Sequence, residues 1–333
     1  MANARVMKRT CSKETFEREH LGPGVPVVLM RVARAWPAFR KWSWDFFATE
    51  AKDDPVLLML DGDRSGGARK ESTVGEYLES FDQLRSTPTG TARPPSASVP
   101  YLREWAFANR HPEWLDDIEP MVYFDDLFAG CPIDERPSLT WLFIGPAGTF
   151  TPAHIDLWHT DAWIAQIHGR KRVRIWTKGD DDPDSGDKAL INTPSLPYDF
   201  QEVILEPGDV LYLPSDTPHE VYALDDSISV SSNFMSAPRA AKVRPLYEDW
   251  LARRAVSRQI DMVKKRLRLL RALEELINED SEEEGDRSSN GRNRGGRMNA
   301  MQRSALDEKG PLERRLRELQ EQPHLGEWVP TTL

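Results

Sequence analysis

Two histidines and one aspartate have the types and spacing of a metal site. His154 and Asp156 form an H-x-D triplet, and His219 follows in the segment L-P-S-D-T-P-H-E-V. If the triplet lies on a strand, the two-residue period places both side chains on one face. Two imidazoles and one carboxylate leave further coordination positions of an ion open, which suits non-haem Fe(II). The triplet alone fits equally well with a strand histidine that is hydrogen-bonded to a neighbour.

The sequence around these residues predicts short strands that would bring them together. An apolar run follows the triplet and turns at Gly169-Arg170 into alternating residues that include Lys171. The block E-P-G-D-V-L-Y-L-P predicts a strand, a tight turn and another strand shortly before His219. The other strands are expected over 139–144, 200–205, 220–223 and 228–233. A small barrel of such strands would place the late histidine beside the early pair.

Helices and loops are predicted on both sides of these strands. Toward the N-terminus we expect a strand over 25–32, a helix capped by Ser43, a strand over 55–60, a helix over 72–84 and a surface loop over 87–98. A polar insertion over 177–199 is expected at the barrel mouth. Helical periodicity over 240–278, a low-complexity stretch over 279–299 that we expect to be disordered, and a short helix over 311–320 follow.

Composition indicates a soluble protein of a reducing compartment. The 333 residues suffice for one large or two ordinary domains, and the net charge of −10 argues against a general nucleic-acid binder. Cys11 and Cys131 are too few for a disulfide framework or a zinc module, so we expect a cytoplasmic location. No apolar run approaches the roughly 18 residues of a membrane helix. The first residues lack the apolar segment of a secretory signal.

Four sequence blocks, in order, make the chain similar to one enzyme family. The chain resembles the jumonji-C (JmjC, cupin-like) hydroxylases over about residues 15–240, in L-F-I-G-P-A-G-T-F-T-P-A-H-I-D, A-W-I-A-Q-I-H-G-R-K-R, E-P-G-D-V-L-Y-L-P and S-I-S-V-S-S-N-F. The resemblance implies a mainly β fold with flanking helices, built on a double-stranded β-helix (jelly-roll, cupin) core. It also implies an oxygenase that uses Fe(II), 2-oxoglutarate and O2.

The resemblance and the pattern changes together predict the domain organisation. The oxygenase domain is expected over 1–240, with an N-terminal lead-in over 1–135 and the barrel core over 136–240. A helical segment over 241–280 would pack on its own domain or form a homodimer with a second copy. A low-complexity linker over 281–300 and a short helical tail over 301–333 are expected after it.

The resemblance assigns roles to residues at both ends of the co-substrate. The family pattern implies metal and catalytic ligands at His154, Asp156 and His219, and co-substrate contacts at Lys171, Thr151, Tyr101, Ser231 and Asn233. The resemblance implies that Lys171 pairs with the far carboxylate of 2-oxoglutarate. Lys171 shares a strand face with Val173, which predicts an interior lysine that needs a partner. Ile164 stands where some relatives place a co-substrate-contacting asparagine, so we expect that contact to be missing.

The substrate is expected to be a lysyl, asparaginyl or arginyl side chain in a protein or peptide. The carboxylate ligand gives H-x-D, whereas H-x-E is common in the histone demethylases of this superfamily. Asp161, Trp158 and the acidic loop over 180–187 could face a cationic target, although such a run is more often a solvated loop. His159 is expected in a turn at the mouth, and His168 is expected to pack.

Other functions remain open at this level. The alternatives are hydroxylation of a free amino acid or a natural-product peptide, hydroxylation of a modified tRNA base, demethylation, and a non-catalytic cupin module. The segment R-x-R-G-G-R keeps the tRNA alternative open, although the net negative charge of the chain argues against a nucleic-acid partner. No membrane partner is expected.

Overall fold

The computed structural model describes residues 6–60, 69–85, 99–119, 121–176, 200–286 and 306–321. The loop predicted over 87–98, the insertion over 177–199 and most of the predicted linker lie outside the described residues. The described chain divides after Arg244 into two compact units. The domain boundaries predicted from the sequence stay predictions.

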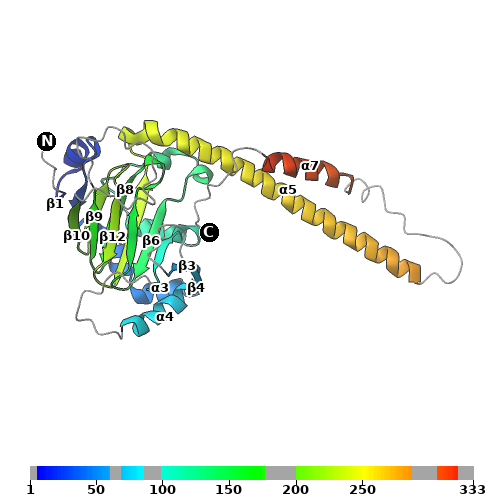
Figure 1. Cartoon of the computed structure of the whole chain (residues 1–333), viewed down its shortest axis with the longest axis horizontal. Helices are drawn as coiled ribbons and strands as arrows, with labels where there is room; N and C mark the ends of the chain where they lie inside the picture. Colours follow the sequence, from blue (N-terminus) through cyan, green and yellow to red (C-terminus); the bar gives the residue numbers. More distant parts are fainter. Residues whose placement is uncertain are drawn as a thin grey trace. The chain divides into compact units, whose positions relative to one another are not determined.

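Two β-sheets form the core of the first unit. The larger sheet contains, in spatial order, β1 (Met7–Arg9), β2 (Val27–Leu29), β11 (Val210–Leu213), β8 (Asp161–His168), β13 (Ser227–Phe234), β6 (Thr140–Gly145) and β5 (Leu102–Trp105). The smaller sheet contains β10 (Gln201–Leu205), β9 (Lys171–Ile175), β12 (His219–Ala223) and β7 (Phe150–His154). From β6 to β13 every consecutive pair of strands except β9 and β10 crosses from one sheet to the other, as in a jelly roll. Figure 1 shows the strands of this barrel. The predicted fold class is therefore confirmed.

Alternating residues of the strands fill the space between the two sheets. Members of one apolar cluster come from both sheets: Val28, Ala162, Ile164, Val173, Ile175, Val203, Leu205, Leu211, Leu213 and Val221. Along β9, Lys171, Val173 and Ile175 are buried, whereas Arg172 and Arg174 are partly exposed. This alternation places Lys171 inside the barrel, as its shared face with Val173 predicts.

The N-terminal lead-in forms a second, aromatic core with the larger sheet. Its short elements are α1 (Lys13–Phe16), η1 (Glu17–Leu21), η2 (Val32–Ala35), α2 (Ala38–Lys41), α3 (Trp44–Glu50), the hairpin of β3 (Pro55–Met59) and β4 (Arg69–Thr73), and α4 (Val74–Arg85). Figure 1 shows α3 and α4 close to this hairpin. The cluster joins Phe16, Trp36 and Phe47 from the lead-in to Trp163 and Tyr212 from the sheet. This aromatic core holds the lead-in against the larger sheet, which forms one wall of the barrel.

Local capping decides where two of these helices begin. Ser43 caps α3 as predicted, because its hydroxyl accepts a hydrogen bond from the Phe46 amide at 3.1 Å. The helix predicted from residue 72 begins at Val74 instead, and the residues before it belong to β4. Thr73 and Glu76 cap each other reciprocally, each side chain accepting from the other residue's amide at 3.2 Å. This capping box starts the helix two residues later than the apolar pattern predicts.

Short 3-10 helices lie in the connections that follow β5 along the chain. They are η3 (Phe107–Asn109), η4 (Pro112–Ile118), η5 (Leu127–Gly130), η6 (Ile133–Glu135), η7 (Leu157–His159) and η9 (Ala237–Arg239). Of these, η7 lies between the two strands that flank the H-x-D triplet, and η9 leads into the long helix that ends the first unit.

Two helices make up the described part of the second unit. The helix α5 (Ala240–Asp286) begins in the first unit and extends beyond residue 278, into the stretch predicted to be disordered. The helix α7 (Lys309–Gln320) spans the predicted short helix and is held to α5 by Arg266–Glu308 at 2.9 Å and Lys309–Glu274 at 2.5 Å. The predicted homodimer through residues 241–280 stays a prediction. Among the described helices, none is both long and apolar enough to cross a membrane.

Candidate metal centre

The structure brings the three predicted metal ligands together. His154 is the last residue of β7 and His219 the first of β12, and the two lie directly opposite each other in the sheet. Their ring centroids are 4.2 Å apart. One candidate ligand atom from each of His154, Asp156 and His219 lies within 4.8 Å of the other two.

The H-x-D triplet does not lie wholly on one strand. The strand ends at His154, and Asp156 occupies the position that precedes η7. Its Oδ1 lies 3.8 Å from His154 Nε2. Asp156 has extended backbone angles, with φ −66° and ψ 157°, so its carboxylate approaches His154 from just beyond the strand end.

Backbone carbonyls orient both imidazoles for metal binding. His154 Nδ1 lies 2.8 Å from the Pro152 carbonyl, and His219 Nδ1 lies 3.0 Å from the Thr217 carbonyl. A carbonyl only accepts hydrogen bonds, so each neutral ring carries its hydrogen on Nδ1 and presents the Nε2 lone pair. Burial and the nearby His154 lower the pKa of His219 to about 4, which keeps that ring neutral.

This donor set fits a first-row divalent metal such as Fe(II). Two imidazoles and one carboxylate are the ligands of the non-haem iron sites that keep several positions open. The His154 side chain is 36% exposed and the Asp156 side chain 20% exposed, whereas His219 is buried. The open side of the site therefore faces the barrel mouth, where a co-substrate and a substrate can enter.

Strand register places Lys171 on the same inner face, farther into the barrel. Lys171 lies opposite Ala223 on β12, and His154 lies opposite His219, four residues earlier on the same strand. Residues four apart on a strand point to the same side and are about 13 Å apart along it. A lysine side chain and a five-carbon diacid can together span that separation. The metal ligands and Lys171 are thus the two ends of one site.

Lys171 is a buried cation whose neighbours are hydroxyls and the rings of Tyr101 and Phe143. It is 2% exposed, and its Nζ donates to Ser229 Oγ at 2.5 Å and lies 3.2 Å from Tyr101 Oη. Among the described residues, no carboxylate lies within ion-pair distance of it. Burial lowers the pKa of Lys171 to about 7. An uncompensated buried ammonium is costly, so this position favours an anionic ligand.

Two hydroxyls and one glycine complete the inner end of the site. Tyr101 is buried and hydrogen-bonded to Thr151, and burial raises its pKa, so the phenol stays protonated and can donate. Gly145 leaves room for the Tyr101 ring: a Cβ there would lie 2.7 Å from Tyr101 Cδ2. The turn before Lys171 needs Gly169, whose φ is +65° and whose added Cβ would lie 2.1 Å from the Asp226 carbonyl oxygen.

Ser231 and Asn233 lie on β13 but are engaged by the fold itself. Ser231 Oγ donates to the Trp163 carbonyl at 2.9 Å. Asn233 Nδ2 donates to Thr160 Oγ1 at 2.9 Å. Neither contacts Lys171 or a metal ligand through these bonds, and their predicted role toward the co-substrate stays a prediction.

Two residues of the site were not singled out from the sequence. Ser229, whose hydroxyl accepts a hydrogen bond from Lys171, lies two residues before Ser231 on β13, so the strand period places both on one face. The contact with Lys171 spans the two sheets, which the strand period does not predict. Trp141 lies directly opposite Ser231, and its indole N–H is buried without a partner among the described residues. An unsatisfied buried donor in this position is available to a ligand.

The hypothesis that Asp161 faces a cationic target is wrong. Asp161, the first residue of β8, is 0% exposed. Its carboxylate accepts hydrogen bonds from Tyr212 Oη at 3.1 Å, the Ser215 amide at 2.9 Å and Ser236 Oγ, and Arg239 Nε lies 3.7 Å away. Burial raises its pKa, against these donors. Asp161 therefore ties three segments together and does not meet substrate.

The other mouth residues are also placed by the structure. Trp158 is buried, with its ring 6.5 Å from that of Phe128, so it too faces the fold. The acidic loop over 180–187 lies outside the described residues. His159 lies in the predicted turn, and His168 packs near Trp44, with ring centroids 6.5 Å apart.

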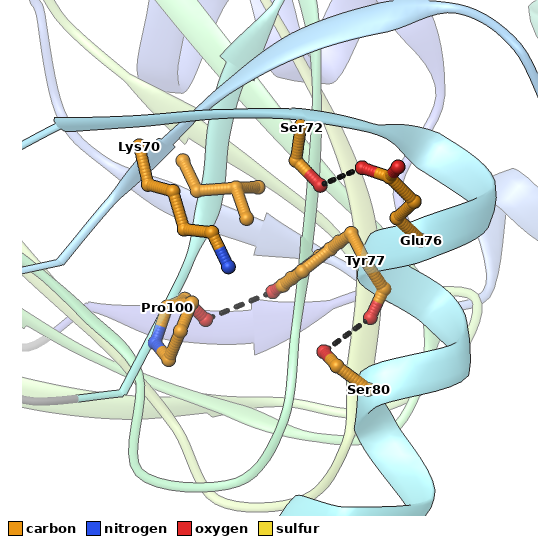
Figure 2. A pocket seen from close by; sticks show the side chains of 7 residues that line it. Lys70, Ser72, Glu76, Tyr77, Ser80 and Pro100 are labelled. Atoms are coloured by element: carbon orange, nitrogen blue, oxygen red, sulfur yellow. Dashed lines mark hydrogen bonds between the residues drawn. The ribbon is translucent and has the colours of Figure 1, made fainter.

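A separate pocket lies on the lead-in, away from the metal ligands. Figure 2 shows Lys70, Ser72, Glu76, Tyr77, Ser80 and Pro100 around it; the seventh lining residue is Leu58. Its polar groups are mostly used internally, since Tyr77 Oη donates toward the Pro100 carbonyl and Glu76 accepts from Ser72 (Figure 2). No residue of the metal centre lines this pocket.

Comparison with known proteins agrees with this geometry. A JmjC domain model matches residues 124–243, and a cupin-like domain model matches residues 13–180, half of the chain. The chain is 28% identical over 292 residues to arginine-specific demethylase JMJ22 of Arabidopsis thaliana, covering 80% of this chain and 53% of that protein. It is 26% identical over 276 residues to the 2-oxoglutarate and iron-dependent oxygenase JMJD4 of Gallus gallus, covering 74% and 63% respectively.

A third relative is similar to the chain over a comparable length. Lysine-specific demethylase JMJ30 of Arabidopsis thaliana is 30% identical over 247 residues, which cover 68% of this chain and 54% of that protein. The chain thus spans between about half and two thirds of the length of these curated relatives. Together with the jelly-roll core, the domain matches show that the chain belongs to the JmjC, cupin-like family.

Proposed function

We propose that the protein is an Fe(II)- and 2-oxoglutarate-dependent oxygenase that hydroxylates an amino-acid side chain in a protein or peptide. The observation that carries the proposal is the buried Lys171, without a carboxylate partner among the described residues, on the same barrel face as His154 and His219. A dicarboxylate that chelates a metal at one end and pairs with an ammonium at the other satisfies both ends of this site. The relatives named 2-oxoglutarate and iron-dependent oxygenases support the same reaction class.

The chain's own residues would orient the reactants. His154, Asp156 and His219 would hold Fe(II) on one side, while Lys171, Tyr101 and Thr151 would bind the far carboxylate of 2-oxoglutarate. With metal, 2-oxoglutarate and O2 bound, the centre supplies oxidative decarboxylation to succinate and CO2, coupled to insertion of one oxygen atom into a substrate C–H bond. Substrate positioning at the mouth determines which C–H bond reacts.

The substrate class rests on the sequence pattern and on the relatives. The H-x-D ligand pair supports a lysyl, asparaginyl or arginyl hydroxylase. The expected cytoplasmic location is compatible with such a protein substrate and stays a prediction. Because Asp161 is buried, recognition of a cationic side chain would have to use other groups at the mouth.

Succinate production tests the reaction class. The protein is incubated with Fe(II), ascorbate and 2-oxoglutarate, first alone and then with a peptide library rich in lysine, asparagine and arginine. We expect succinate from the wild type and none from His154→Ala, and a peptide that gains one oxygen atom. If the metal-loaded wild type neither forms succinate with any peptide nor binds 2-oxoglutarate, the non-catalytic cupin module becomes the better account.

Demethylation is the second candidate, because several relatives are named demethylases. The same chemistry at an N-methyl group gives a carbinolamine that releases formaldehyde. Methylated lysyl and arginyl peptides in the same assay separate the two functions. Formaldehyde with loss of a methyl group would identify a demethylase, whereas a stable gain of oxygen would identify a hydroxylase.

A further inference from the structure

The segment that follows Asp156 and the segment that precedes His219 contain residues with left-handed backbone. Trp158 and His159 have φ values of 57° and 55°, and Asp216 has a φ of 59°. His159 follows Asp156 by three residues, and Asp216 precedes His219 by three. Left-handed backbone at residues other than glycine persists only where the surroundings enforce it. The contacts that enforce it here therefore bear on the placement of two of the three ligands.

The Asp216 carboxylate joins these loops to each other and to α5. His159 Nδ1 is hydrogen-bonded to Asp216 Oδ1, and Lys242 Nζ lies 3.3 Å from Asp216 Oδ2. The Asp216 side chain is 18% exposed, compared with 63% for Lys242. Burial by itself would raise the pKa of Asp216, but His159 and Lys242 hold it below its ordinary value, so the carboxylate is ionised.

We propose that Asp216 is a positioning residue, which through His159 sets the spacing between the Asp156 and His219 loops and so tunes metal affinity. The inference rests on the proposed metal site. It follows from the topology, because β7 and β12 pair at His154–His219 and no strand contact extends to Asp156 beyond that point. The His159–Asp216 contact bridges the loops on the side where the strands end.

The neighbouring tie to Asp161 does not replace this contact. The Ser215 amide donates to Asp161 Oδ1 at 2.9 Å, which holds the His219 loop to the first residue of β8. That bond anchors the Ser215 segment at Asp161, which lies five residues after Asp156 in the chain. The His159–Asp216 contact instead reaches the residues that directly follow Asp156 in the chain. Groups hydrogen-bonded directly to metal ligands typically contribute about 10- to 100-fold in affinity, and Asp216 acts one residue further out, so we expect an effect near the lower end of that range.

Metal titration with a redox-stable probe tests the proposal without turnover. Co(II) binding to the full chain is followed by visible absorption and by competition with a chelator, for wild type, Asp216→Ala, Asp216→Asn and Lys242→Met. We expect Asp216→Ala to bind Co(II) about tenfold or more weakly with an altered spectrum. Asp216→Asn, which keeps an oxygen that accepts from His159, should recover most of the affinity. Lys242→Met is the matched control and should stay within about twofold of wild type.

Two outcomes overturn the proposal. One is an affinity and spectrum of Asp216→Ala equal to those of wild type. The other is a loss shared by Lys242→Met and matched by a fall in the melting temperature of the metal-free protein, which would assign Asp216 a structural role only. His154→Ala separates this proposal from the metal site itself: if His154→Ala binds Co(II) as the wild type does, the site is wrong and not merely its support.

Discussion

Replacing Lys171 with methionine should stabilise the metal-free protein while weakening its affinity for 2-oxoglutarate at least tenfold. Burial lowers the pKa of Lys171 from 10.5 to about 7. That shift corresponds to a cost of about 5 kcal/mol for keeping the charged ammonium in the fold, at about 1.4 kcal/mol per pKa unit. Methionine keeps most of the stem and removes the charge. Since native proteins are stable by only about 5–15 kcal/mol, the gain is large enough to measure.

The gain in stability of Lys171→Met over the wild type should decrease as pH rises above 7. Below pH 7 the ammonium is protonated in the folded and unfolded chains, so the wild type bears the whole cost. Between pH 7 and 10.5 the folded protein releases this proton before the unfolded chain does, so the wild type gains stability as pH rises. The advantage of Lys171→Met should therefore be greatest below pH 7, fall as pH rises from 7, and vanish above pH 10.5.

Urea unfolding at several pH values, followed by tryptophan fluorescence, measures this difference. Arg172→Met is the matched control, because Arg172 is on the same strand and faces outward, with its guanidinium 4.9 Å from the Tyr222 ring. The control should show no comparable gain. A Lys171→Met protein that is no more stable than the wild type at pH 7, or a gain that does not change with pH, would refute the assignment of an uncompensated buried cation.

Binding of 2-oxoglutarate should raise the lowered pKa of Lys171 again. An anionic carboxylate beside Lys171 favours the protonated amine, so binding of 2-oxoglutarate at pH 8 should take up about 0.9 proton from the buffer. Calorimetry in buffers of different ionisation enthalpy measures this uptake with Mn(II)-loaded protein. Lys171→Met should lose about 2–5 kcal/mol of binding free energy together with the proton uptake. Binding without proton uptake would indicate that the carboxylate lies elsewhere.

Three further predictions concern the surroundings of the site. Gly145→Ala should displace the Tyr101 ring and weaken 2-oxoglutarate binding, with Mn(II) affinity unchanged by equilibrium dialysis. Asp161→Ala should lower the free energy of unfolding by about 3–5 kcal/mol in a urea titration, because it leaves buried donors unpaired. Mn(II) at a hundredfold excess over its Kd should raise the free energy of unfolding by about 2.7 kcal/mol, with no effect on His154→Ala. Equal thermal shifts in that variant would contradict the ligand assignment.

The sequence predicts most of the barrel, because the barrel follows a two-residue period. The period places Lys171 inside with Val173, and the turn glycine before it marks where β8 ends and β9 begins. The hairpin strand β4 was missed because R-K-E-S-T has no apolar alternation, and its pairing with β3 provides what the pattern lacks. Periodicity therefore predicts strands that bury one face, and not strands that only pair at an edge.

The sequence predicts less of the site, since several contacts depend on how the two sheets pack. Alternation puts Ser229 and Ser231 on one face, but Ser229 meets Lys171 across the two sheets, and no strand period predicts that contact. Asp156 lies beyond the end of β7, where its extended backbone still brings its carboxylate to 3.8 Å from His154. Asp161 has the charge of a surface residue, and its burial depends on donors from distant segments such as Ser236.

The central claim is that the histidine–aspartate cluster and Lys171 form one site for one ligand. Calorimetric titration of 2-oxoglutarate into Fe(II)-loaded protein without oxygen tests it most directly, with wild type, Asp156→Ala, Lys171→Met and metal-free protein side by side. The structure predicts binding to the loaded wild type, and a loss of about tenfold or more, or 1.4 kcal/mol, in each of the other three. Equal affinity in the metal-free protein, or in Lys171→Met, would show that the two ends do not hold the same molecule.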